Sequence, residues 1–117
     1  MPKKVLIVDD DPEILDYLSE LLQDNGYETV TAHNGVDGLE KVHAEQPALI
    51  TLDMDMPEKG GTNFYAGLRK DQTIRDIPVI VVSGVGPRPP VLTKDVPTIS
   101  KPIDNAKLLQ LVSEMIQ

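Results

Sequence analysis

Asp53 is a carboxylate at the end of a predicted strand, a position from which a side chain can bind a ligand or react. It ends a mostly apolar run over residues 48–53, which indicates a buried strand whose last residue is a carboxylate. In an open α/β sheet, ligands bind beyond the carboxyl ends of the strands. The same carboxylate could instead only cap the turn that follows, and this stretch alone leaves both interpretations open.

Four other polar residues share this feature, because each ends or directly follows a predicted strand. They are Asp9 and Asp10 after the first strand, Ser83 at the end of the fourth and Lys101 after the fifth. Parallel strands place their carboxyl ends at one edge, so we expect three carboxylates, a hydroxyl and an ammonium to converge there. Any one of these residues alone is usually structural. A functional site is indicated because all five residues lie at the carboxyl ends of predicted strands.

This combination indicates a magnesium site that handles a phosphoryl group. Carboxylates about 4 Å apart repel each other by roughly 1–4 kcal/mol, and Lys101 alone cannot neutralise three of them. Mg²⁺ is commonly held by carboxylates and waters, and it leaves positions for phosphate oxygens. An oxygen of Asp53 could accept a phosphoryl group as the nucleophile, with Lys101 neutralising the phosphoryl oxygens and Ser83 donating to one of them.

Composition limits the partners and the compartment. The 117 residues fit one domain, 1–117, and the net charge of −8 argues against direct binding of nucleic acid or of an anionic membrane. Aromatic residues make up only 3%, so we expect an aliphatic core, and the absence of Cys excludes disulfides and thiolate chemistry. We find no run long enough to span a membrane and no signal-peptide core, and therefore expect a cytoplasmic protein.

Strand and helix patterns alternate along the chain, which predicts a parallel sheet with helices on both faces. We expect Asp11 and Asp104 to cap helices, and Asp9 and Asp10 to have no structural role. In the loop 57–62, Gly60 and Gly61 are expected to supply positive φ. The predicted strands cover residues 5–8, 28–32, 48–53, 79–82 and 98–100, and the predicted helices follow at 12–25, from 35 to before Pro47, at 63–71 and from 105.

Together these patterns resemble the receiver domain of bacterial two-component response regulators. The resemblance covers nearly the whole chain and implies a flavodoxin-like, doubly wound α/β fold with five parallel strands in the order 2-1-3-4-5. Four motifs carry it: Val-Leu-Ile-Val-Asp-Asp-Asp-Pro at 5–12, Leu-Asp-Met-Asp-Met-Pro at 52–57 with Gly61, Ile-Pro-Val-Ile-Val-Val-Ser-Gly at 77–84, and Ser-Lys-Pro at 100–102.

The resemblance implies a phosphoacceptor signalling module rather than an enzyme that acts on an external metabolite. Asp53 would receive a phosphoryl group from the phosphohistidine of a sensor histidine kinase or a phosphotransfer protein. Phosphorylation would then switch the binding of a downstream protein. The only catalysis implied is self-phosphorylation and self-dephosphorylation at Asp53.

The resemblance also implies the ligands of the metal and of the phosphoryl group, together with a cis peptide bond between Lys101 and Pro102. Mg²⁺ would be bound directly by Asp10 and Asp53, mainly through water by Asp9, and by the backbone carbonyl of Asp55. Phosphoryl oxygens would be bound by Ser83 and Lys101.

Two features depart from the family pattern. The family commonly has an aromatic residue three positions before the Lys of the fifth strand. This aromatic side chain swings inward when the hydroxyl residue moves toward the phosphoryl group. This chain has Thr98 at that position, which argues against the usual coupling between the two residues. Four prolines in residues 85–97 occupy the place of the fourth helix, where we expect a loop with at most one helical turn. The usual output surface is therefore expected to be remodelled.

Two alternatives stay open. Thr98 and the proline-rich segment are compatible with a phosphorylation-independent interaction domain that keeps its pocket as a relic, although all five pocket residues are present. The pair Asp53 and Asp55 also resembles the Asp-x-Asp pair of haloacid-dehalogenase-type phosphatases. In those enzymes the pair follows the first strand, whereas here it follows the third. An acid at Asp55 could repel a phosphoryl group, orient a water or simply be exposed.

Overall fold

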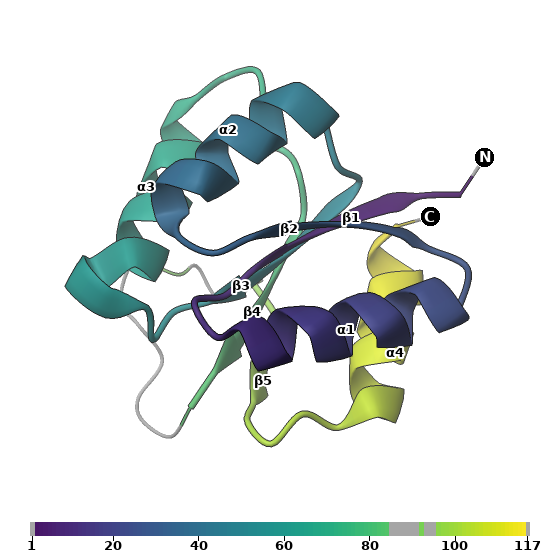
Figure 1. Ribbon diagram of the computed structural model, residues 1–117. Helices are drawn as coiled ribbons and strands as arrows, with labels where there is room; N and C mark the ends of the chain where they lie inside the picture. Colours follow the sequence, from purple (N-terminus) through teal and green to yellow (C-terminus); the bar gives the residue numbers. More distant parts are fainter. Residues whose placement is uncertain (1, 85–91, 93–95, 117) are drawn as a thin grey trace.

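The computed structural model describes residues 2–84, residue 92 and residues 96–116, and in these residues five strands form one parallel sheet. The strand order is β2-β1-β3-β4-β5, which confirms the predicted doubly wound topology (Figure 1). The strands are β1 (Lys4–Val8), β2 (Glu28–Ala32), β3 (Leu49–Asp53), β4 (Val79–Ser83) and β5 (Thr98–Ser100).

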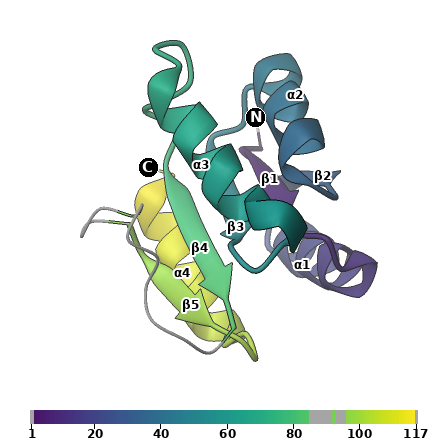
Figure 2. The same cartoon turned by 90° about the vertical axis from the view of Figure 1, so that its left-hand side faces the viewer.

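Helices cover both faces of the sheet, as Figures 1 and 2 show. The first and last helices pack on one face through Leu18, Leu22, Leu108 and Val112, and the other two pack on the opposite face through Val42, Phe64 and Leu68. Both cores are largely aliphatic, as the composition predicts. The α-helices are α1 (Pro12–Asp24), α2 (Gly35–Glu45), α3 (Gly60–Lys70) and α4 (Asn105–Met115), and a short 3₁₀ helix, η1 (Pro57–Lys59), precedes α3.

Strand register brings the carboxyl ends of the strands to one edge. Val8 of β1 pairs with Leu52 of β3, so the residue after each of them, Asp9 or Asp53, lies at the same level. Asp53 in turn pairs with Val82 of β4. The central strands are buried on both faces, which explains why they read as continuous apolar runs rather than alternating ones.

The helix starts follow from local capping. The Asp11 carboxylate accepts a hydrogen bond from the Glu13 backbone N–H at 2.9 Å, and Pro12 occupies the first turn. Asp104 caps α4 in the same way, accepting from the Lys107 N–H at 3.2 Å. Both predicted caps are confirmed.

The connection between β3 and α3 differs from the prediction. Gly60 has an ordinary helical φ of −56°, and it is Glu58 that has a positive φ, at 57°. The helix α3 therefore begins three residues earlier than expected, at Gly60 rather than Asn63. Gly61 is required for a different reason: a Cβ there would lie 2.6 Å from the Asp53 carbonyl oxygen. Its missing side chain lets the start of α3 lie against the backbone of β3.

The predicted proline-rich loop at 85–97 falls mostly on residues 85–91 and 93–95, which lie outside the described residues. Leu92 and Val96 are described, and both are buried in the core on the α2 and α3 face. Thr98 is exposed at the start of β5. No helix in the described part of the chain is long and apolar enough to cross a membrane.

Candidate functional site

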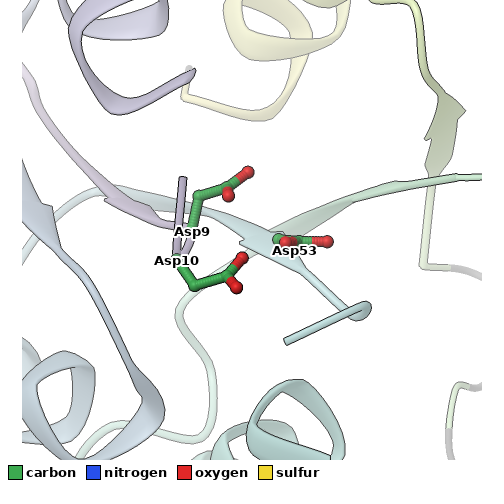
Figure 3. A group of neighbouring side chains, drawn as sticks. All are labelled: Asp9, Asp10 and Asp53. Atoms are coloured by element: carbon green, nitrogen blue, oxygen red, sulfur yellow. The ribbon is translucent and has the colours of Figure 1, made fainter. Parts of the chain in front are cut away.

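Three carboxylates meet at the carboxyl edge of the sheet. Asp9 and Asp10 follow β1 and Asp53 ends β3, and Figure 3 shows their side chains projecting toward the same side of the strand ends. Each offers an oxygen, and these oxygens all lie within 4.8 Å of one another. The predicted convergence of the three acids therefore occurs.

The three acids differ in their exposure. Asp9 and Asp53 are each only 2% exposed, whereas Asp10 is exposed. Within the described ranges, Asp9, Asp53 and Thr51 are the only polar or charged residues that are buried. Burying a charged carboxylate is unfavourable unless it is paired, so two buried acids side by side at the edge of the sheet point to a binding role rather than a purely structural one.

Each buried acid also holds the turn that follows it. The Asp53 Oδ1 accepts a hydrogen bond from the Asp55 backbone N–H at 2.9 Å, so the capping interpretation of Asp53 is correct alongside its place in the cluster. The Asp9 Oδ1 accepts from the Asp11 N–H at 2.9 Å. The expectation that Asp9 has no such role was wrong, because its position two residues before a backbone N–H permits the same turn.

Lys101 brings a positive charge to the cluster. Its Nζ lies 3.4 Å from the Asp9 Oδ2 and 3.7 Å from the Asp53 Oδ1. Partial burial by itself lowers the pKa of Lys101, but the carboxylates of Asp53 and Asp9 outweigh this effect and the net shift is upward. The ammonium therefore stays charged beside two buried acids.

Burial raises the pKa of Asp53 from 3.8 to about 6. The hydrogen bond from the Asp55 backbone and the nearby Lys101 lower it, whereas the negative charges of Asp9 and Asp55 raise it further. The single positive charge of Lys101 does not offset the effects of burial and of two acidic neighbours on the pKa of Asp53. This electrostatic imbalance favours a cation at the site.

Ser83 lies at the end of β4, and its contact is with Asp55. The Ser83 Oγ donates to the two Asp55 carboxylate oxygens at 3.4 and 3.3 Å, and the Gly84 backbone N–H donates to the Asp55 Oδ2 at 2.5 Å. Sequence reasoning did not identify Gly84. The signal available was a strand that ends in Ser-Gly, where a backbone N–H follows the hydroxyl.

The strand β5 positions Lys101 beside the end of β4. The Lys101 backbone N–H donates to the Ser83 carbonyl oxygen at 2.8 Å, which extends the β4–β5 pairing by one residue. The peptide bond between Lys101 and Pro102 is cis, and this prediction is confirmed.

Comparison with known families matches residues 5–113 to the response regulator receiver domain. The chain belongs to this family. It is a receiver domain of the response regulator type, and its fold and strand order agree with that membership.

Relatives and solved structures agree with the assignment to receiver domains. The chain is 32% identical to protein Rrf1 of Nitratidesulfovibrio vulgaris over 99% of the chain and 84% of the relative. It is 36% identical to the polar-differentiation response regulator DivK of Brucella anthropi, over 71% of the chain and 68% of DivK. The structure of chemotaxis protein CheY4 from Vibrio cholerae superposes with a TM-score of 0.86 at 27% identity, covering 98% of this chain and 99% of CheY4.

Receiver domains typically bind Mg²⁺ at an acidic cluster, and the acids of this chain fit one such ion. Two oxygens that bind one Mg²⁺ at about 2.1 Å each lie no more than about 4.2 Å apart. Separations within 4.8 Å thus suit a single cation after a small side-chain movement or with one water between. The donor set is all oxygen, which is the set that Mg²⁺ prefers.

Proposed function

We propose that this receiver domain is a phosphoacceptor module in which Asp53 accepts a phosphoryl group from a phosphohistidine. The donor is a sensor histidine kinase or a phosphotransfer protein, and the phosphorylated form binds a downstream protein differently. The observation that carries the proposal is the buried Asp53 carboxylate beside Asp9, Asp10 and Lys101 at the carboxyl edge of the sheet.

Each residue has a role in the transfer. An oxygen of Asp53 forms the new O–P bond while the N–P bond of the phosphohistidine breaks, and the imidazole nitrogen leaves with the electron pair. Lys101 pairs with one phosphoryl oxygen, because its Nζ already lies 3.7 Å from Asp53. The Ser83 hydroxyl donates to another.

The acids of the cluster would hold Mg²⁺, with Asp10 and Asp53 as direct ligands, Asp9 acting through a water, and the backbone carbonyl of Asp55 as the remaining ligand. When bound there, Mg²⁺ supplies positive charge beside the phosphoryl oxygens. Exposure of Asp10 leaves this carboxylate accessible from solvent.

Incubation with acetyl phosphate and MgCl₂, followed by intact-mass measurement, tests the proposal. We expect the wild type to gain one phosphoryl group and Asp53→Asn to gain none. Asp16→Asn, which changes an exposed acid of α1, is the matched control and should gain the group normally.

Two outcomes would contradict the proposal. A wild-type protein with no mass gain would favour the phosphorylation-independent interaction domain, and a gain that persists in Asp53→Asn would place the acceptor elsewhere. Hydrolysis of a generic phosphomonoester with turnover, abolished by Asp53→Asn, would instead support the phosphatase alternative.

A further inference from the structure

A second carboxylate lies next to the acceptor and already has hydrogen-bond donors of its own. The Asp55 carboxylate accepts from the Ser83 hydroxyl at 3.3 Å and from the Gly84 backbone N–H at 2.5 Å. We call these two donors the Ser83–Gly84 corner. Ser83 ends β4 and Gly84 directly follows it, and β4 lies directly beside β3 in the sheet.

The corner suits an anionic oxygen. A hydroxyl and a backbone N–H donate to the same carboxylate. The Gly84 contact at 2.5 Å is a short charge-assisted bond, a kind stronger than neutral ones, whereas the Ser83 contact at 3.3 Å is longer and weaker. Gly84 favours the close approach, because a Cβ there would lie 3.0 Å from the Asp55 Oδ2, which would have to shift by a few tenths of an ångström. A side chain at this position would press on the carboxylate that the N–H binds.

The turn after β3 directs Asp55 to this place. Its backbone N–H is bound to the Asp53 Oδ1 at 2.9 Å, so the acceptor itself fixes the residue whose side chain reaches the corner. Only one residue separates the two carboxylates in sequence.

We propose that the Asp55 carboxylate is an internal competitor of the phosphoryl group: it occupies the Ser83–Gly84 corner in the unphosphorylated chain and must leave before a phosphoryl oxygen can bind there. The inference rests on the proposed function, since it assumes that Ser83 serves a phosphoryl group on Asp53. No covalent bond is made or broken in this exchange; hydrogen bonds to Asp55 are replaced by hydrogen bonds to a phosphoryl oxygen. One anionic oxygen replaces another on the same two donors.

The competition makes Asp55 a determinant of how readily the pocket accepts a phosphoryl group. An amide at this position keeps the size of the side chain but is a weaker acceptor and carries no charge. Asp55→Asn therefore weakens the competition for the corner and removes a repulsive charge, and both effects favour the incoming anion. Because the backbone is unchanged, the carbonyl of residue 55 stays available to the metal.

Beryllium trifluoride, a phosphoryl mimic, provides the test when it is titrated with MgCl₂ into the intact chain and followed by ¹⁹F NMR. We expect Asp55→Asn to bind the mimic about tenfold more tightly than the wild type, the effect of losing one charged hydrogen bond. Glu58→Gln removes a charge from a neighbouring exposed residue outside the corner, and this control should change the affinity less than about threefold.

The amide proton of Gly84 reports the contact without any phosphoryl mimic. In the wild type it is bonded to a carboxylate, so we expect a downfield ¹H shift that moves upfield in Asp55→Asn and stays unchanged in Glu58→Gln. Asp55→Ala, which removes the acceptor entirely, should give the same upfield movement. Thermal unfolding of each variant verifies that the fold is retained.

The outcomes separate the two proposals. If the mimic binds neither the wild type nor Asp55→Asn, the proposed function fails and the competition fails with it. If the mimic binds both with equal affinity, or binds Asp55→Asn more weakly, the competition is overturned while the phosphoacceptor function stands. An unmoved Gly84 amide in both Asp55 variants would overturn the contact itself.

Discussion

At the scale of single residues, Asp53 combines a structural and a chemical task. Its Oδ1 holds the following turn through the Asp55 N–H, and the same oxygen lies 3.7 Å from the Lys101 Nζ. A carboxylate held by its own turn needs little reorientation when it reacts, which is the benefit of a preorganised site. The disadvantage is that its charge is buried, and this lowers the stability of the metal-free protein.

The pKa of Asp53 predicts how stability changes with pH. Because its folded pKa is about 6 and its ordinary value 3.8, the folded state binds more protons between these values, and the metal-free protein loses stability as pH rises through them. Asp53→Asn does not titrate, so we expect it to be more stable than the wild type at about pH 7.5, by at most about 3 kcal/mol.

Urea unfolding in the presence of a chelator measures this difference. The advantage of Asp53→Asn should shrink when the pH is lowered to about 4.5, where the wild-type acid is largely protonated in the folded state. Asp16→Asn should show no such pH-dependent advantage, because Asp16 is exposed. A destabilised Asp53→Asn at neutral pH would contradict the assignment of this buried charge.

At the scale of elements, the start of α3 packs against the backbone of β3 at the proposed acceptor residue, Asp53. A Cβ on Gly61 would lie 2.6 Å from both the Asp53 carbonyl oxygen and the Met54 Cα. These are backbone atoms, which cannot rotate away as a side chain can. The start of α3 thus depends on a glycine that packs against the residue proposed to be phosphorylated.

Gly61→Ala is expected to destabilise the protein by about 1–3 kcal/mol, because the added methyl group overlaps with backbone. Gly67→Ala in the same helix is the matched control. Its Cβ would lie 3.2 Å from the Leu39 Cδ1, a side-chain end that can move, and Ala favours a helix by about 1 kcal/mol over Gly. We therefore expect Gly67→Ala to be near neutral or stabilising in urea unfolding.

Equal effects of the two substitutions would contradict this account of the β3–α3 contact. A Gly61→Ala protein that retains its fold should also show altered amide shifts at Met54 and Asp55. Gly67→Ala should leave those shifts unchanged, since its contact is with α2.

At the scale of the whole molecule, negative charge is distributed unevenly. The net charge is −8, and three carboxylates with one ammonium gather at one edge of the sheet. Excess charge of one sign destabilises a compact state through self-repulsion, and simple salt screens it. A specific cation site should stabilise the folded protein further, beyond the effect of general screening by salt.

We expect MgCl₂ to stabilise the protein more than KCl does at the same ionic strength of about 0.1 M. At a Mg²⁺ concentration about ten times Kd, the excess should be about 1.4 kcal/mol by mass action. Asp10→Asn should lose this excess while keeping the response to KCl. Thermal unfolding in the two salts measures both, and an excess that survives in Asp10→Asn would place the ion elsewhere.

Much of the fold followed from local pattern, because strand burial and helix capping act between neighbouring residues. The runs ending at Asp9, Asp53 and Ser83 and the caps at Asp11 and Asp104 could be identified from residue types alone. Parallel topology then implied that the strand ends share one edge. The strand order and the cis bond before Pro102 came from the family resemblance, and both are confirmed.

The tertiary structure decided where the side chains of the turn after β3 lie. Sequence reasoning placed positive φ on the glycines, whereas packing of α3 against β3 requires Gly61 to be small and leaves positive φ to Glu58. It also could not pair Asp55 with Gly84, 29 residues away. Contacts of this kind depend on the conformation of a turn and the register of two strands together, and no local pattern encodes that combination.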